Sequence, residues 1–269
     1  MRNEERDGTE YKVWQANDPC CVFLLVHGLG AHSIRWANAA KYLVDNNISS
    51  YAVELSRFFP DGKPDHKLNR IGLYLKKIFK LYNIIREENP SKKIFLVGES
   101  MGALISFLVC IKYPYIFRGL ICLSPAFATK DKLSLKQSLK MILPIFHDPN
   151  REFPLPFNSE MCTRDTECRK VLDNDPREHR TISSRLACGI ITAQIKADIF
   201  KERMRTPALF LLSGDDKLVD PGVSKRIFNS LNVKDKTLVD FPGMYHSLSI
   251  EMDREKVFEC MVNWAKERI

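Results

Sequence analysis

Gly98-Glu99-Ser100-Met101-Gly102 follows an apolar run, Ile94–Val97, and opens a second apolar segment, Ser100–Tyr113. The first run predicts a buried strand. The second predicts a helix packed against a sheet, because it is apolar on nearly all sides. A serine in a G-x-S-x-G turn between strand and helix adopts strained backbone angles, and the glycines let neighbouring chain pass without a Cβ clash. The pattern therefore predicts that Ser100 is a nucleophile exposed at a tight strand-to-helix turn.

The segments on either side of this turn alternate between apolar runs and helical patterns. Further strands are expected at Val22–Val26, Ser50–Leu55, Gly119–Leu123, Ala208–Ser213 and Thr237–Phe241. Helices are expected at Ile34–Asn46 and Leu68–Glu88, from Val223 onward, and from about Glu251 to Arg268. This alternation predicts an α/β fold with a mostly parallel central sheet that is flanked by helices.

The alternation stops at Ser124. Residues 125–200 contain several prolines and short helical patches, but no convincing strand. We therefore expect a helical cap at 125–200, inserted after the strand that ends near Leu123, and an α/β core formed by 1–124 and 201–269. Such a cap would cover the carboxyl edge of the sheet, where ligands of open α/β sheets bind.

A serine hydroxyl becomes a good nucleophile only when a base removes its proton, and His246 is the expected base. It lies in Gly243-Met244-Tyr245-His246-Ser247, directly after the expected strand Thr237–Phe241. This places it at the same edge of the sheet as Ser100. The chain has six histidines, and only His246 follows the late strand, where the order Ser…Asp…His requires a histidine.

The acid that orients this histidine should follow the preceding strand. Three aspartates compete there: Asp215, Asp216 and Asp220. Asp220 precedes a proline, which is typical of a helix N-cap, and Asp215 follows a glycine and is expected to shape a turn. Asp216 is therefore the expected partner of His246.

The first expected strand leads into the glycine-containing loop His27-Gly28-Leu29-Gly30. A glycine-rich loop could bind phosphate, but this one has neither the G-x-G-x-x-G nor the Walker spacing. With a serine nucleophile nearby, the loop is expected to form half of an oxyanion hole. The backbone N–H groups of Leu29 and Met101 would then stabilise the oxyanion. His27 is expected to be structural, with its ring satisfied behind the loop.

Charge and hydropathy limit the partners of the chain. It has 269 residues, a hydrophobic share of 45% and a formal charge of +8. The basic residues are scattered without interleaved aromatic side chains, so we expect no nucleic-acid partner. No apolar stretch approaches the length that spans a bilayer. The charged N-terminus is not followed by an apolar run, so we expect no secretory signal and a cytoplasmic location.

The eight cysteines form no Cys-x-x-Cys pair and no Cys/His cluster with zinc-ligand spacing. We therefore expect no bound metal, and the expected chemistry requires no cofactor. In a cytoplasm the thiols should be reduced. The sequence leaves a Cys162–Cys168 disulfide open.

Together, these segments resemble the monoacylglycerol lipase branch of the α/β-hydrolases, often described as lysophospholipases. Residues 27–36, His-Gly-Leu-Gly-Ala-His-Ser-Ile-Arg-Trp, are similar to its H-G-x-G-x-H-S-x-R-[YF] segment, and Gly98–Gly102 matches its nucleophile turn. Asn174-Asp175-Pro176 resembles its cap segment N-D-P-L. Asp216–Asp220 and Gly243–Leu248 fit its acid and histidine loops. The resemblance covers nearly the whole chain, in the right order.

The resemblance implies the α/β-hydrolase fold and a serine hydrolase that cleaves monoacylglycerols or similar single-chain esters through an acyl-enzyme. Two departures affect the head-group preference. The stretch Glu54–Pro60 lacks the glycines of the branch's D-x-x-G-x-G-x-S pattern, and Ala31 stands where glutamate is common. A short-chain carboxylesterase, a thioesterase or another acyl hydrolase remains an alternative. A non-catalytic binding protein on this fold is a more remote one.

The cap contains an amphipathic pattern. Its apolar residues Leu135, Leu139, Ile142 and Leu143 fall on one helical face, and Lys132, Lys136 and Lys140 fall on another. One interpretation is a helix packed on the domain with its lysines in water. The other is a basic amphipathic surface that contacts a membrane or lipid aggregate peripherally. Because the cap is rich in apolar side chains, we also expect a tunnel for an acyl chain. Leu139, Ile142 and Leu143 are the candidate substrate contacts.

Overall fold

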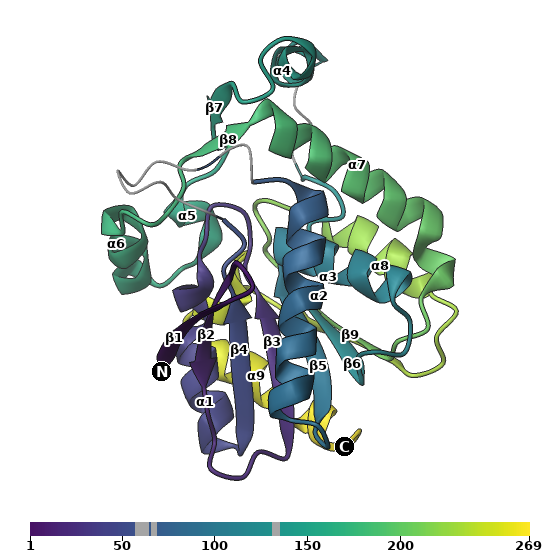
Figure 1. Ribbon diagram of the computed structural model, residues 1–269. Coiled ribbons are helices and arrows are strands. Elements are labelled where there is room, and N and C mark those ends of the chain that lie inside the picture. The colour runs from purple at the N-terminus through teal and green to yellow at the C-terminus, as the bar shows by residue number, and fades with distance from the viewer. Residues whose placement is uncertain (57–64, 66–68, 131–134) are drawn as a thin grey trace.

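The computed structural model describes residues 1–56, 65, 69–130 and 135–269, without the side chains of 135–138. Its centre is an eight-stranded sheet in the order β1-β2-β4-β3-β5-β6-β9-β10 (Figure 1). The strands are β1 (Arg2–Arg6), β2 (Thr9–Trp14), β3 (Cys21–Val26), β4 (Ile48–Val53), β5 (Lys93–Glu99), β6 (Gly119–Leu123), β9 (Ala208–Ser213) and β10 (Lys236–Phe241). The pairs from β4 to β10 are parallel, and β1 and β2 are antiparallel. The predicted α/β class with a mostly parallel sheet is confirmed.

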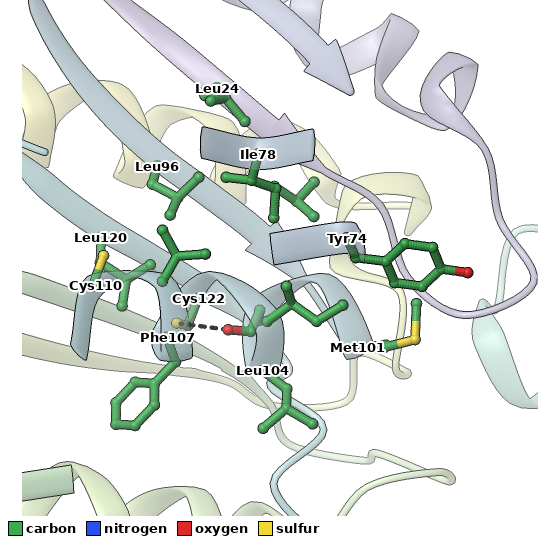
Figure 2. Packing of buried hydrophobic residues seen from close by; sticks show 14 of the residues in the cluster. Leu24, Tyr74, Ile78, Leu96, Met101, Leu104, Phe107, Cys110, Leu120 and Cys122 are labelled. Carbon is green, nitrogen blue, oxygen red and sulfur yellow. Dashed lines mark hydrogen bonds between the residues drawn. The ribbon is translucent and has the colours of Figure 1, made fainter. Parts of the chain in front are cut away.

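Helices cover both faces of this sheet. One face carries η1 (Ser33–Trp36), α1 (Ala37–Asp45) and α9 (Arg254–Lys266), and the other carries α2 (Ile71–Glu88), α3 (Met101–Lys112) and α8 (Pro221–Asn229). Strand β3 divides its side chains between two separate apolar cores: Val22, Leu24 and Val26 face one, and Cys21, Phe23 and Leu25 face the other. Figure 2 shows the first core, where Leu24 and Leu96 of the sheet lie under Ile78. Burial on both faces explains why the strands are continuous apolar runs.

An insertion between β6 and β9 lies beyond one end of the sheet (Figure 1). It contains α4 (Leu135–Ile142), η2 (Leu143–Phe146), β7 (Glu152–Pro154), α5 (Ser159–Cys162), α6 (Thr166–Asn174), β8 (Thr181–Ser183), α7 (Ser184–Phe200) and η3 (Lys201–Arg203). The expectation of no strand in this insertion is wrong, because β7 and β8 pair antiparallel. Each has three residues, too few to show the alternation by which strands are recognised. The cap boundaries at 125–200 stay a prediction.

The N-terminal hairpin was not expected from the sequence. It consists of β1 and β2, joined by Asp7 and Gly8, which have φ values of 54° and 68°. An Asp-Gly pair with both φ angles positive is a favoured two-residue hairpin turn. The charged residues of β1 carry no apolar pattern, so the turn is the only local signal. Within the described ranges, no helix is both long enough and apolar enough to cross a membrane.

Candidate active site

The turn from β5 into α3 places Ser100 at the edge of the sheet with φ 56° and ψ −121°. Such a backbone is strained for a non-glycine residue, and this strain is typical of functional sites. The flanking glycines are required by space. A Cβ on Gly98 would lie 2.5 Å from the carbonyl oxygen of Gly102, and a Cβ on Gly102 would lie 2.2 Å from that of Val26. Only glycine fits at positions 98 and 102, so this turn requires the G-x-S-x-G pattern.

The structure brings together the three side chains expected to form the triad. His246 Nε2 lies 2.8 Å from Ser100 Oγ, and His246 Nδ1 lies 2.9 Å from Asp216 Oδ2. Asp216 and His246 are 1% and 3% exposed. Two backbone N–H groups, from Leu218 and Val219, donate to Asp216 Oδ1 at 2.8 and 2.9 Å. These two hydrogen bonds thus fix the orientation of the carboxylate relative to the imidazole.

The two competing aspartates lie elsewhere. Asp215 is exposed, and its backbone N–H donates to the carbonyl oxygen of Met244. Asp220 caps α8, where its side chain accepts a hydrogen bond from the N–H of Gly222 at 2.8 Å. Both positions agree with the turn and N-cap roles expected for them, and only Asp216 contacts the histidine.

The loop after β3 lies directly over the serine. A Cβ on Gly28 would be 3.2 Å from Ser100 Cβ, so the backbone here passes close to the nucleophile. Leu29 and Met101 both line the pocket beside it. Met101 is the first residue of α3, and its N–H therefore has no acceptor within the helix. The positions of the two amides are consistent with the predicted oxyanion hole. Their role as oxyanion donors stays a prediction.

Glu54 holds this loop from behind, a role that the sequence did not reveal. Its carboxylate accepts hydrogen bonds from the N–H and the hydroxyl of Ser33, at 3.0 and 2.8 Å. His27 Nε2 lies 3.1 Å from Glu54 Oε1, and His27 Nδ1 lies 2.9 Å from the Gly28 carbonyl oxygen. Burial works to raise the pKa of Glu54, but the bonds from His27 and Ser33 outweigh it and lower the pKa to about 2. The ring of His27 is thus tied on both sides, as expected.

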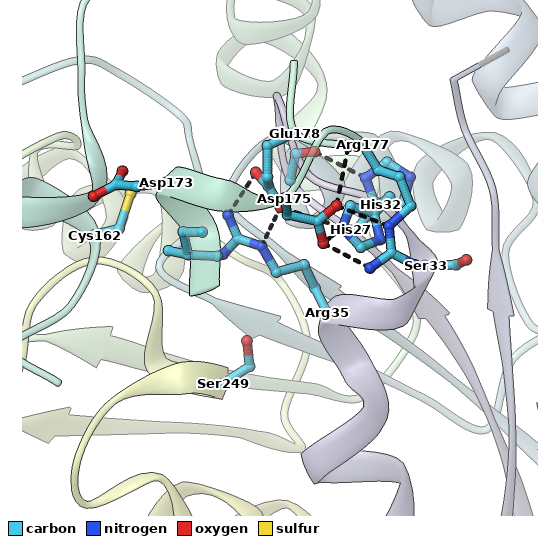
Figure 3. Close-up of polar contacts among 12 residues, drawn as sticks. His27, His32, Ser33, Arg35, Cys162, Asp173, Asp175, Arg177, Glu178 and Ser249 are labelled. Atoms are coloured by element: carbon cyan, nitrogen blue, oxygen red, sulfur yellow. Dashed lines mark hydrogen bonds and ion pairs between the residues drawn. The ribbon is translucent and has the colours of Figure 1, made fainter. Parts of the chain in front are cut away.

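The cap is joined to the segment after β3 by an ion pair and by a hydrogen bond between a histidine and a carboxylate (Figure 3). Arg35 donates two hydrogen bonds to Glu178 at 2.7 and 2.8 Å, and His32 Nε2 lies 3.2 Å from Asp175 Oδ2. The bonds from Arg177 hold the pKa of Asp175 well below its usual range. Burial lowers the pKa of the His32 imidazole. Two sequence segments that separately resemble the lipase branch therefore meet in space.

The pocket beside Ser100 is lined from both the core and the cap. Tyr74 comes from α2, Ile182 from β8 and Leu186 from α7. Its enclosed volume is about 10 Å³, which is near the minimum that holds one water molecule. At this volume the pocket is too small to hold an acyl chain.

The three cap residues predicted to contact substrate do not line this pocket. Leu139 and Leu143 are 43% and 52% exposed, and Ile142 is half-buried. Lys132 and the side chains of Leu135 and Lys136 lie outside the described part of the chain, so the predicted lysine face is only partly visible. Contact of Leu139, Ile142 and Leu143 with substrate stays a prediction.

The cysteines and acidic residues form no further centre in the described ranges. All eight cysteines, Cys162 and Cys168 among them, carry free thiols. No three His, Cys, Asp or Glu side chains gather there in a way that could hold a metal ion.

The chain is similar to known lipases over nearly its whole length. The monoglyceride lipase of Mus musculus is 24% identical over 264 residues, which cover 96% of this chain and 86% of that protein. Phospholipase YtpA of Bacillus subtilis is 25% identical over 256 residues, covering 92% of this chain and 96% of that protein. The crystal structure of the Paleococcus ferrophilus monoacylglycerol lipase matches with a TM-score of 0.85 at 25% identity, over 97% of this chain and 99% of that one.

The fold is therefore the α/β-hydrolase fold, as the resemblance implied. A family profile described as "Serine aminopeptidase, S33" matches residues 17–253, a range that includes Ser100, Asp216 and His246. Since this match spans most of the sequence, the chain belongs to that family of hydrolases.

Proposed function

We propose that this protein hydrolyses carboxylic esters with a single acyl chain, and that monoacylglycerols are its main substrates. The observation that carries the proposal is the hydrogen-bonded chain from Ser100 through His246 to Asp216, next to a pocket between core and cap. The names of the relatives support the substrate class, because they include monoglyceride lipases and a phospholipase.

In the proposed mechanism, Ser100 Oγ attacks the ester carbonyl while His246 Nε2, 2.8 Å away, takes the hydroxyl proton. Asp216 holds the imidazole and stabilises its positive charge. The amides of Leu29 and Met101 donate to the oxyanion. The alcohol leaves with the proton from His246, and a water molecule then hydrolyses the acyl-enzyme by the same route in reverse roles.

The apolar part of the pocket lining favours a thin apolar substrate. It consists of Leu29, Tyr74, Met101, Ile182 and Leu186, and it lies beside the polar residues Ser56, Asn69, His179, Thr181 and Ser183. Each methylene of a substrate buried against the apolar part contributes up to about 0.8 kcal/mol. The pocket must enlarge to hold even one chain, and three chains would require a much larger opening between core and cap. We therefore propose that triacylglycerols are poor substrates.

We predict that kcat/KM for monoacylglycerols rises with acyl length from two to about eight carbons, by roughly two- to four-fold per methylene at most. The measurement is a chain-length series below the critical micelle concentration, so that aggregation does not imitate preference. Matched thioesters and aminoacyl amides test the thioesterase and peptidase alternatives. A flat or falling profile would replace the lipase proposal with a short-chain esterase, and faster cleavage of thioesters or amides would replace it with those activities.

We further propose that the cap contacts lipid surfaces peripherally, from the cytoplasmic location expected from the sequence. The segment from α4 to η2 exposes Leu139, Leu143 and Phe146, and Phe146 is 85% exposed. Helix α7 packs against both α4 and η2 and exposes Ile195 and Ile199. Leu139, Leu143 and Phe146 lie within one short segment. Exposed apolar side chains grouped in this way often mark an interaction site, and a monoacylglycerol lipase must reach substrate held in a bilayer.

Phe146→Ser should weaken binding to vesicles of phosphatidylcholine and phosphatidylserine, measured by flotation, by about three- to ten-fold. The estimate assumes that part of the phenylalanine is buried in lipid on binding. Tyr115→Ser is the matched control, because Tyr115 is 76% exposed but follows α3, outside the cap. Equal losses from both variants, or none from Phe146→Ser, would contradict cap-directed binding.

A further inference from the structure

Glu251 is a buried charged residue outside the triad, five positions after the proposed catalytic base. It follows η4 (Leu248–Ile250), and its side chain is 0% exposed. Its Oε1 accepts hydrogen bonds from the backbone N–H groups of Tyr245 at 3.0 Å and Arg164 at 2.9 Å. Its Oε2 accepts one from the N–H of Met252 at 2.9 Å and one from the Arg164 guanidinium at 3.0 Å.

This arrangement satisfies a carboxylate that would otherwise be costly to bury. Burial works to raise the pKa of Glu251. The hydrogen bonds from Arg164, Tyr245 and Met252 outweigh this effect and hold the pKa below its ordinary value. Arg164 is fixed in turn by Asp253, 3.3 Å away. The carboxylate is therefore ionised at neutral pH, and its four donors converge on it from three separate places in the chain.

Two contacts bear directly on the histidine loop, one from Glu251 and one from the cap segment. Glu251 holds the N–H of Tyr245, the residue before His246. The N–H of Ser247, the residue after His246, donates to the carbonyl oxygen of Cys162 at 2.8 Å. Cys162 is two residues before Arg164, on the same short cap segment. The backbone on both sides of His246 is thus tied to one frame, made of Glu251 and the cap segment 162–164.

We propose that Glu251 is a positioning residue for the hydrolysis. It clamps the cap segment at Arg164 to the loop that carries His246, and so aims the imidazole at Ser100. The inference rests on the proposed function, because it requires His246 to be the base. The position of the imidazole matters because a misplacement of about 1 Å can lower the rate about 100-fold.

Glu251→Gln tests this role with little change in shape. The glutamine amide keeps one oxygen acceptor. Its NH₂ group replaces the other oxygen and would face the N–H donors that bond to that oxygen in the wild type. We expect kcat for a soluble ester to fall about 10- to 100-fold, while KM changes less than about two-fold because the pocket lining is untouched. The rate at which a fluorophosphonate labels Ser100 should fall by the same factor, since labelling requires the same aligned imidazole.

Arg164→Gln is the second variant, in case Glu251→Gln does not fold. The substituted side chain, Arg164, is 32% exposed. The variant removes the ionic partner of Glu251 and leaves Glu251 three backbone donors. A smaller loss of kcat, about three- to ten-fold, is expected. Glu251→Asp keeps the negative charge on a side chain that is shorter by one methylene. Its kcat should lie between those of wild type and Glu251→Gln.

Asp165→Asn is the matched control. Asp165 pairs with Arg254 at 3.1 Å and also links the cap to the segment after the histidine loop, but it touches neither Glu251's carboxylate nor the backbone next to His246. It should change kcat less than about two-fold. The inference is overturned if a folded Glu251→Gln, or a folded Arg164→Gln where the former does not fold, labels and turns over like wild type. It is also overturned if Asp165→Asn loses as much activity. Failure of wild type to label at all would instead overturn the proposed function.

Discussion

Ser100→Ala should lower kcat by about 10⁴- to 10⁶-fold while the protein folds normally. The hydroxyl is the atom that forms the acyl-enzyme, and its removal leaves only the oxyanion amides and substrate binding to accelerate attack by water. Alanine meets the same backbone strain at φ 56° that serine already tolerates. The thermal midpoint should therefore stay within a few degrees of wild type. Activity is measured with a soluble ester, and labelling with a fluorophosphonate.

Ser124→Ala is a control of matched chemistry. Ser124 is also a buried serine with positive φ, 39°, and it follows the neighbouring strand β6. Its hydroxyl has no hydrogen-bond partner among the described residues, so its removal should change activity less than about two-fold. Retention of more than about a tenth of wild-type activity by Ser100→Ala would remove the serine from the mechanism. It would also favour a hydrolase that uses a different nucleophile.

The core elements were predictable because their signals are local. Strand β3 is an unbroken apolar run that lies between two cores, and the glycines of the nucleophile turn are fixed by contacts within β3, β5 and α3. Ser100, Asp216 and His246 could be predicted to meet because each follows a parallel strand, and the carboxyl ends of parallel strands lie at one edge. The short pair β7 and β8 was missed because three residues each are too few to establish a period.

The supporting residues of the site were not predictable, because each acts over a long sequence distance. Glu54, just after β4, contacts Ser33 in η1. Arg35 contacts Glu178 in the expected cap, and Glu251 contacts Arg164. No spacing rule links such partners. Their only sequence signal is a charged residue next to a segment whose apolar pattern predicts burial. That signal identifies residues in need of a partner without saying which partner they have.

Asp216→Asn should fold and lower kcat by about 10⁴-fold, through the wrong tautomer of the histidine. Two backbone N–H groups donate to Asp216 Oδ1, so the amide oxygen of asparagine takes that place. The NH₂ group then occupies the position of Oδ2, which is the nearer of the two oxygens to His246 Nδ1, at 2.9 Å against 3.1 Å for Oδ1. Because an NH₂ group donates, it meets an unprotonated Nδ1 and leaves the proton on Nε2. That proton removes the lone pair that Ser100 requires from its base.

The neighbouring aspartates, Asp215 and Asp220, provide controls for Asp216→Asn from the same loop. Asp215→Asn alters an exposed side chain, and Asp220→Asn retains an oxygen that can still cap α8. Each should therefore retain at least about a third of wild-type kcat, as is usual for substitutions without a partner in the chemistry. The measurement is kcat and KM for all three variants at one pH, with thermal midpoints to exclude unfolding. If Asp215→Asn or Asp220→Asn proves the costliest, the hydrogen bond from His246 Nδ1 to Asp216 does not orient the base, and the acid must be sought at that other position.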